Sequence, residues 1–305
     1  MLNELFSSLG TTLQRTVGKS ALSQARQKLK ASAFVELNQC LRDLAEAYCP
    51  TPCWLGLCLP NNPKTAAEFG LQHDRHGLSF VMARALGLYD TASRHLFKTV
   101  LADYHAAERT LLTGLLPERG TDDLLVLDRG YPALWLFPLL HQLGRPFTAS
   151  GLDEQVVTRP LGRDALHRAR KQGLELTRHE VSFRLIRVLL PSGQEEILAT
   201  SLLDVQLYPA TGFAALYHQR WGIEEAFKVL KHRRNVEQFS GELPESIRQD
   251  FHAKIFTANL AHIMACTGQE VLPEAKRSLP GQSGLHAVHA TSAPVRMAAE
   301  PSGAR

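Results

Sequence analysis

The chain has 305 residues, of which 44% are hydrophobic and 21% charged, with a formal net charge of +4. This is the composition of a soluble globular protein with one large domain or two smaller ones, and the mildly basic balance is only weak evidence for a polyanionic partner. The odd number of cysteines, five, argues against a closed disulfide framework. No apolar stretch reaches the roughly 18 residues that a membrane-spanning helix needs, so we expect a cytoplasmic protein.

The N-terminal part begins with helical patterns and continues with strands. Good helix formers and apolar spacing predict a helical region over residues 1–48. Residues 50–63 are rich in turn-forming residues and enclose only a short apolar run. Two strands are predicted at 79–90 and 95–104, joined by a short hairpin connection. A helix is expected over about 105–116.

The middle of the chain alternates between strand and helix patterns. The compact apolar run at 122–128 predicts a buried strand that ends at an acidic residue. A helix is predicted at 132–143, followed by a basic segment at 159–178. Two more strands are expected at 181–190 and 195–203, with a Pro-Ser-Gly turn between them.

The C-terminal part is predicted to hold a long helix over 211–234 and a last helix over about 248–268. The order of elements indicates an α/β core with an inserted β-rich piece at about 145–205. We therefore divide the chain into the N-terminal helical region, a domain at 49–274, and a tail at 275–305. The tail is rich in Gly, Ser, Pro and Ala, and we expect it to be disordered or altered by a change of reading frame.

The most informative stretch is YHQRWGIEEAFKVLK at residues 217–231. Steps of three and four residues return to the same face of a helix, so this stretch carries one polar stripe. The stripe consists of Tyr217, Arg220, Glu224, Lys228 and Lys231. The opposite face is expected to be buried through Phe227, Leu230 and Trp221. Taken alone, the stripe is also compatible with an ordinary solvated face that carries ion pairs.

The spacing Tyr, two residues, Arg, three residues, Glu, six residues, Lys resembles the signature of a bacterial transposase family. That family is the insertion-sequence-four group of DDE transposases. The resemblance covers about residues 15–275 and includes the segments NNPKTAAEFG at 61–70, VLDRGY at 126–131 and LATSLLD at 198–204.

The resemblance implies an RNase H-like fold in which two aspartates and one glutamate hold two Mg²⁺ or Mn²⁺ ions. Two metals stabilise both the attacking and the leaving oxygen of a phosphodiester, and such hard cations prefer carboxylate oxygens. By resemblance, Asp128 is the second aspartate and Glu224 is the glutamate, and both are catalytic metal ligands. The rival Glu225 does not fit the spacing. Considered without the resemblance, Asp128 is also compatible with a turn or a helix cap.

The implied reaction is cleavage at transposon ends and joining of the 3′-hydroxyl to target DNA. By resemblance, Tyr217, Arg220 and Lys231 contact the phosphates that flank the cut, and Lys228 adds a cation beside them. The implied partner is double-stranded DNA, with a homodimer assembled on it.

The sequence departs from the family pattern at the first aspartate. Counting back from the segment LCLPNNP puts Cys53 at that position, and no acidic residue lies between Glu46 and Glu68. A thiol is a soft ligand that is poorly matched to Mg²⁺. The leading interpretation is therefore an enzyme, a DDE transposase whose activity the missing aspartate puts in question. The alternatives are a DNA-binding remnant that does not cut and, less favoured, a nuclease of the same fold.

Overall fold

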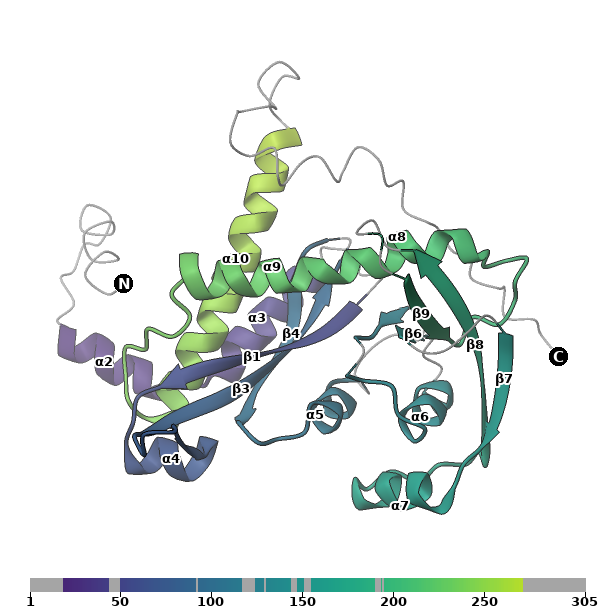
Figure 1. Cartoon of the computed structure of the whole chain (residues 1–305). Coiled ribbons are helices and arrows are strands. Elements are labelled where there is room, and N and C mark those ends of the chain that lie inside the picture. The colour runs from purple at the N-terminus through teal and green to yellow at the C-terminus, as the bar shows by residue number, and fades with distance from the viewer. Residues whose placement is uncertain are drawn as a thin grey trace.

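The computed structural model describes residues 19–43, 50–91, 93–116, 124–128, 130–143, 147–150, 155–189, 193 and 195–270. The predicted tail at 275–305 and the first part of the predicted N-terminal helical region lie outside these residues. Over the described part the fold is mixed α/β, with two sheets and helices on both of their faces (Figure 1). None of the described helices is long and apolar enough to cross a membrane.

The first sheet is antiparallel and centres on β3 (Ser79–Asp90). Strand β1 (Pro50–Leu59) pairs with one edge of β3, while β4 (Leu96–Asp103) and the short β2 (Leu71–His73) pair with the other. The two strands predicted at 79–90 and 95–104, and their antiparallel connection, are confirmed. Helix α4 (Pro63–Phe69) follows β1 and is capped by the Asn62 side chain.

Strand β1 corrects the turn-rich interpretation of residues 50–63. It runs for 10 residues, with Cys53 opposite Gly87 of β3. Proline cannot donate to a sheet, which is why the composition suggested turns. Pro50 and Pro52 both fall near the start of the strand, where a missing donor costs least, and the whole strand is in register with β3.

The second sheet has five strands in the order β5 (Leu125–Val126), β6 (Phe147–Ser150), β9 (Glu195–Thr200), β8 (Glu180–Leu189) and β7 (Gln155–Pro160). Strands β5 and β6 are parallel, and the other pairs are antiparallel. The strands predicted at 181–190 and 195–203 are confirmed. The Thr51 hydroxyl donates to the Val126 carbonyl at 2.7 Å, so β5 lies beside the start of β1 and the two sheets adjoin.

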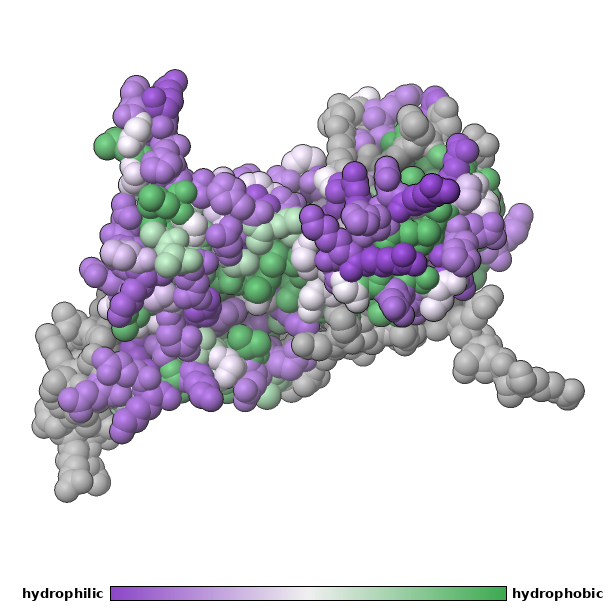
Figure 2. All heavy atoms as spheres, turned by 90° about the horizontal axis from the view of Figure 1, so that it is seen from below, coloured by the Kyte–Doolittle hydropathy of each residue, from purple (hydrophilic) through white to green (hydrophobic). Residues whose placement is uncertain are grey.

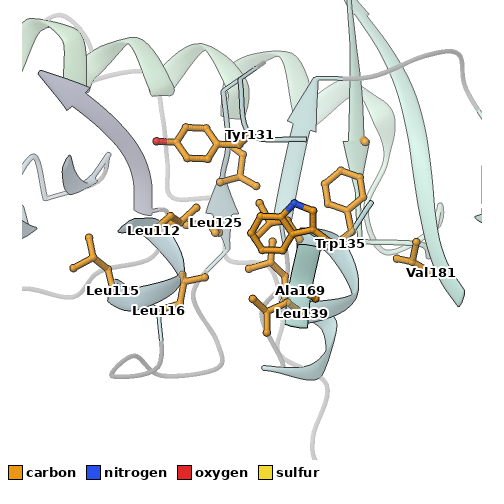
Figure 3. Packing of buried hydrophobic residues seen from close by; sticks show 14 of the residues in the cluster. Leu112, Leu115, Leu116, Leu125, Tyr131, Trp135, Leu139, Ala169 and Val181 are labelled. Atoms are coloured by element: carbon orange, nitrogen blue, oxygen red, sulfur yellow. The ribbon is translucent and has the colours of Figure 1, made fainter. Parts of the chain in front are cut away.

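Alternating side chains of the strands pack against helices on opposite faces of the sheet. In β5 and the residue after it, Leu125 and Leu127 join a core with α5 (Glu108–Leu115), α6 (Leu136–Gln142) and α7 (Arg163–Lys171), while Val126 points to the other face. Figure 3 shows the first of these cores around Leu112, Leu125, Trp135 and Leu139. The helices predicted at 105–116 and 132–143 correspond to α5 and α6.

The opposite face is covered by the C-terminal helices (Figure 1). The helix predicted over 211–234 is a helical run made of η1 (Ala210–Gly212), α8 (Phe213–His218), η2 (Gln219–Trp221), α9 (Gly222–Lys228) and η3 (Val229–Arg233). The run is thus interrupted by 3₁₀ and π turns, features that often mark functional positions. The last helix, α10 (Pro244–Glu270), begins earlier than predicted.

The N-terminal helices pack against this C-terminal half. The prediction of helices before residue 48 is confirmed for α2 (Lys19–Lys28) and α3 (Ser32–Asp43). In α3, the buried Asn38 donates to the Leu96 carbonyl at 3.1 Å and accepts from Asn259 of α10 at 2.7 Å. These contacts tie the N-terminal helices to both β4 and α10.

Candidate functional site

The two carboxylates singled out in the sequence, Asp128 and Glu224, come together around one guanidinium. Asp128 follows β5, and Glu224 lies in the first turn of α9. The Arg220 Nη1 atom lies 3.5 Å from an oxygen of each carboxylate. The side chain of Arg220 is 7% exposed, whereas the side chains of Asp128 and Glu224 are 45% and 36% exposed. The carboxylates therefore face solvent from above a buried cation.

Two aromatic rings hold Arg220 in place. Its guanidinium carbon lies 5.4 Å from the Tyr217 ring centroid and 4.8 Å from that of Trp221. Tyr217 is almost fully buried in a core with Val126 and other residues of the second sheet. This burial excludes an ordinary solvated face for the first two members of the stripe.

The opposite face of the run only partly matches the prediction. Phe227 and Leu230 are buried as expected, but Trp221 is 46% exposed, so its predicted burial is wrong. The reason is local: Trp221 belongs to the 3₁₀ turn η2, where the helical period changes, and its ring covers Arg220 instead of entering the core.

The two lysines of the stripe differ from Arg220 in their partners. The Lys228 Nζ atom lies 2.6 Å from Glu225, an exposed ion pair of the solvated kind that was the alternative interpretation. Lys231 pairs with Glu237 at 3.2 Å. Among the ion pairs of the described residues, Arg220 is the cation that joins the two catalytic candidates, and both lysines remain accessible enough to exchange their partners for a phosphate.

Cys53 packs against the core that holds Ile223 and Phe227, the neighbours of Glu224 in α9. Burial and the nearby Glu224 raise the pKa of its thiol to about 12, with a smaller upward contribution from Asp128. Its Sγ atom donates a weak hydrogen bond to the Trp54 carbonyl at 3.6 Å. At neutral pH the position therefore presents a protonated thiol, without the negative charge that a carboxylate would bring.

Two further residues near the site were missed in the sequence. Tyr131 belongs to the quoted VLDRGY segment but was given no role; it is 2% exposed, and its hydroxyl has no hydrogen-bond partner in the described part of the chain. In Figure 3 that hydroxyl points away from Trp135. Burial raises the pKa of Tyr131, and Glu108, Cys53 and Asp128 raise it further.

Glu108 is a further carboxylate on which Asp128 acts electrostatically. Its pKa is raised, mainly by burial, although Arg84 lies 3.6 Å away and opposes the shift. Neither Glu108 nor Tyr131 carries a spacing signal, because they reach the site from α5 and from the segment after β5. Only the tertiary structure brings them near Asp128.

These residues do not fit a site for two divalent ions. Hard cations need several oxygen ligands, and the pair offers two carboxylates already shared with Arg220, next to a neutral, soft thiol. Among the described residues, no group of three His, Cys, Asp or Glu side chains is arranged to hold a metal ion.

Comparison with known proteins gives the class of the chain. A family model described as a transposase DDE domain matches residues 60–260, so the chain belongs to the DDE transposases. The transposase InsG for insertion sequence element IS4 of Escherichia coli (strain K12) is 26% identical over 270 residues. That alignment covers 80% of this chain and 60% of the relative.

A solved structure also matches. It is a piggyBac transposase synaptic complex with hairpin DNA, with 10% identity and a TM-score of 0.38. The match covers 72% of this chain and 49% of that one. At this level of similarity it does not establish a shared fold.

Proposed function

We propose that this chain is a DNA-binding protein of DNA transposition in which metal-dependent strand cleavage is lost. The observation that carries the proposal is the neutral Cys53 thiol beside Asp128 and Glu224. An active site of this family would have a carboxylate there. The setting we propose is the bacterial cytoplasm, with a homodimer formed on the DNA.

The strand arrangement supports an RNase H-like core for the proposed domain at 49–274. Strands β4, β3 and β1 are antiparallel, β5 lies beside β1, and β6 runs parallel to β5. Strands β7, β8 and β9 then extend the sheet within the proposed insertion at 145–205, before the helix that carries Glu224. In this proposal the start of β1 and the end of β5 bring Cys53 and Asp128 to one edge.

The DNA contacts are proposed for the exposed end of the stripe. Lys228 and Lys231 lie on the last turns of the helical run, next to the exposed Arg233 and Arg234. Such clustered cations bind phosphates without reading sequence. Tyr217 is buried in this conformation, so we assign it to the support of Arg220 rather than to direct phosphate contact.

This arrangement of residues supports no catalytic step through metal ions. The chemistry left to the site is binding: Arg220 neutralises Asp128 and Glu224, which otherwise would repel a phosphate backbone. A chain with this site holds DNA near two carboxylates but lacks the third oxygen ligand for cleavage.

The test uses a labelled duplex that carries the terminal repeats next to the gene. Binding is measured by mobility shift, and cleavage by denaturing gels with Mg²⁺ or Mn²⁺. We expect binding without cleavage by the native chain. Cys53→Asp should restore nicking, and the same change combined with Glu224→Ala should not. Cleavage by the native chain that Glu224→Ala abolishes would show that the site is complete and would contradict the proposal.

A further inference from the structure

We propose that the outward face of α7 is a second surface for duplex DNA, separate from the stripe on α8 and α9. It rests on the proposed DNA binding but concerns another part of the chain. The α7 basic face consists of Arg163, His167, Arg170 and Lys171. The occupant that we propose is the phosphate backbone of a duplex, contacted without sequence preference.

The packing of α7 fixes which side chains point outward. Ala165 and Ala169, 7% and 1% exposed, anchor one side of the helix on the core with α5 and α6. Arg163, His167 and Arg170 follow one another at steps of four and three residues and share the opposite side, which Lys171 borders. All of them are exposed. Figure 2, which views the molecule from below, shows strongly hydrophilic side chains in rows in the right half of the picture.

Basic residues outnumber acids on α7. Within the described part of the chain, Arg163, Arg170 and Lys171 take part in no ion pair, in contrast to Lys228 and Lys231. The only acid of α7 is Asp164, in the first turn. A phosphate can therefore bind these cations without first breaking a protein ion pair.

Helix electrostatics alone do not account for the pattern. Cations in a last turn are stabilised by the negative end of the helix dipole, which explains Arg170 and Lys171. Arg163, however, is the first residue of the helix, where the dipole disfavours positive charge.

Arg163 and Arg170 are also separated by about 10 Å along the axis, which is similar to the roughly 12 Å width of a major groove. A helix laid across a groove would present one cation to each phosphate wall.

The position of α7 separates this surface from the stripe. α7 packs in the core formed with α5 and α6, whereas Tyr217 of the stripe packs in the core on the other face of the second sheet. In Figure 1, α7 lies below the sheets and α8 and α9 lie above them. A straight duplex held at the stripe thus does not reach α7, and the two surfaces bind different DNA segments.

The test compares salt dependence of duplex binding by the full chain. Arg163→Gln, Arg170→Gln and Lys171→Gln are combined in one variant. Lys30→Gln, Lys64→Gln and Arg75→Gln, three exposed cations away from both surfaces, form the matched control. Binding of a labelled duplex of arbitrary sequence is followed by fluorescence anisotropy between 50 and 200 mM salt. Loss of three phosphate contacts should lower the slope of log K against log salt by about 2.7, so that the native chain loses ~40-fold more affinity over this range than the variant.

Three results would decide the inference. A lower slope in the α7 variant, an unchanged slope in the control, and recovery with Arg163→Lys, Arg170→Lys and Lys171→Arg would support it. Equal slopes in the native chain and the α7 variant, with binding still lowered by Lys231→Gln, would overturn the second surface and leave the proposed function intact. Absence of duplex binding by the native chain would overturn both.

Discussion

Replacing Cys53 with aspartate makes the stability of the fold depend on divalent cations. The substitution places a third carboxylate beside Asp128 and Glu224, whose charges already raise the pKa of the thiol. A like charge at ~5 Å costs roughly 3 kcal/mol at an effective dielectric constant of 20. Because the two native carboxylates are 45% and 36% exposed and share Arg220, screening reduces this to a net destabilisation of about 1–2 kcal/mol.

Divalent cations should reverse that loss. An ion with a dissociation constant of ~1 mM stabilises the folded state by about 1.4 kcal/mol at 10 mM. The native chain, with a neutral thiol at this position, should gain far less. The free energy of unfolding is measured by urea titration with 10 mM MgCl₂ and with NaCl of the same ionic strength. This readout does not depend on catalysis.

Cys53→Asn is the matched control, since asparagine has the shape of aspartate without its charge. It should neither lose stability through repulsion nor respond to Mg²⁺. If the aspartate and asparagine variants unfold alike in both solutions, Cys53 does not lie at a latent metal site. The interpretation of this position as the missing ligand would then be wrong.

Three further predictions concern Arg220, Cys53 and His252. Arg220→Ala should lower stability by about 2–3 kcal/mol in urea unfolding, because it leaves two carboxylates together and removes two ring contacts; Arg220→Lys should recover only part, and full recovery would contradict the ring contacts. The Cys53 thiol, with a pKa near 12 instead of 9.0, should be alkylated about a thousandfold more slowly than an ordinary thiol, and mass spectrometry can compare it with the exposed Cys40 and Cys58. Burial, with Arg248 adding to the effect, lowers the pKa of His252 to about 4 from 6.5. The neutral His252 side chain therefore stabilises the fold fully above pH 6.5, and this stabilisation is lost as the pH falls toward 4, by at most about 3 kcal/mol. His252→Gln should weaken the dependence of the free energy of unfolding on pH over this range.

The elements that the sequence predicted well are those whose own pattern determines their environment. Strands β3 and β8 are long apolar runs, and both were predicted within a residue or so. Strand β1 was not, because its prolines and glycine argue locally for turns, while its pairing with β3 comes from residues far along the chain. Helix α7 was seen only as a basic segment, since just Ala165 and Ala169 mark its buried side.

The candidate site was predictable to the extent that it follows the family spacing. The association of Asp128, Glu224 and Cys53 came from resemblance; in the structure Asp128 and Glu224 share Arg220, and Cys53 packs against the core that holds Ile223 and Phe227 of α9. The buried Tyr131 and the 3₁₀ turn that exposes Trp221 could not be predicted. Both depend on how the helical run crosses the sheet, and spacing within one helix contains no information about that crossing.

The stripe has a structural role that is independent of catalysis. Tyr217 and Arg220 are buried at 2% and 6% exposure, and they join the helical run to the second sheet and to Asp128. Replacing either residue would leave a cavity or an unpaired charge, at a cost of several kcal/mol in a protein that is only marginally stable. Folding alone is therefore a sufficient reason for both residues, whether or not the chain cleaves DNA. At position 53 a neutral thiol avoids the repulsion that a third carboxylate would add. Tyr217 and Arg220 are thus required by the fold, and the Cys53→Asp variant tests whether position 53 governs cleavage.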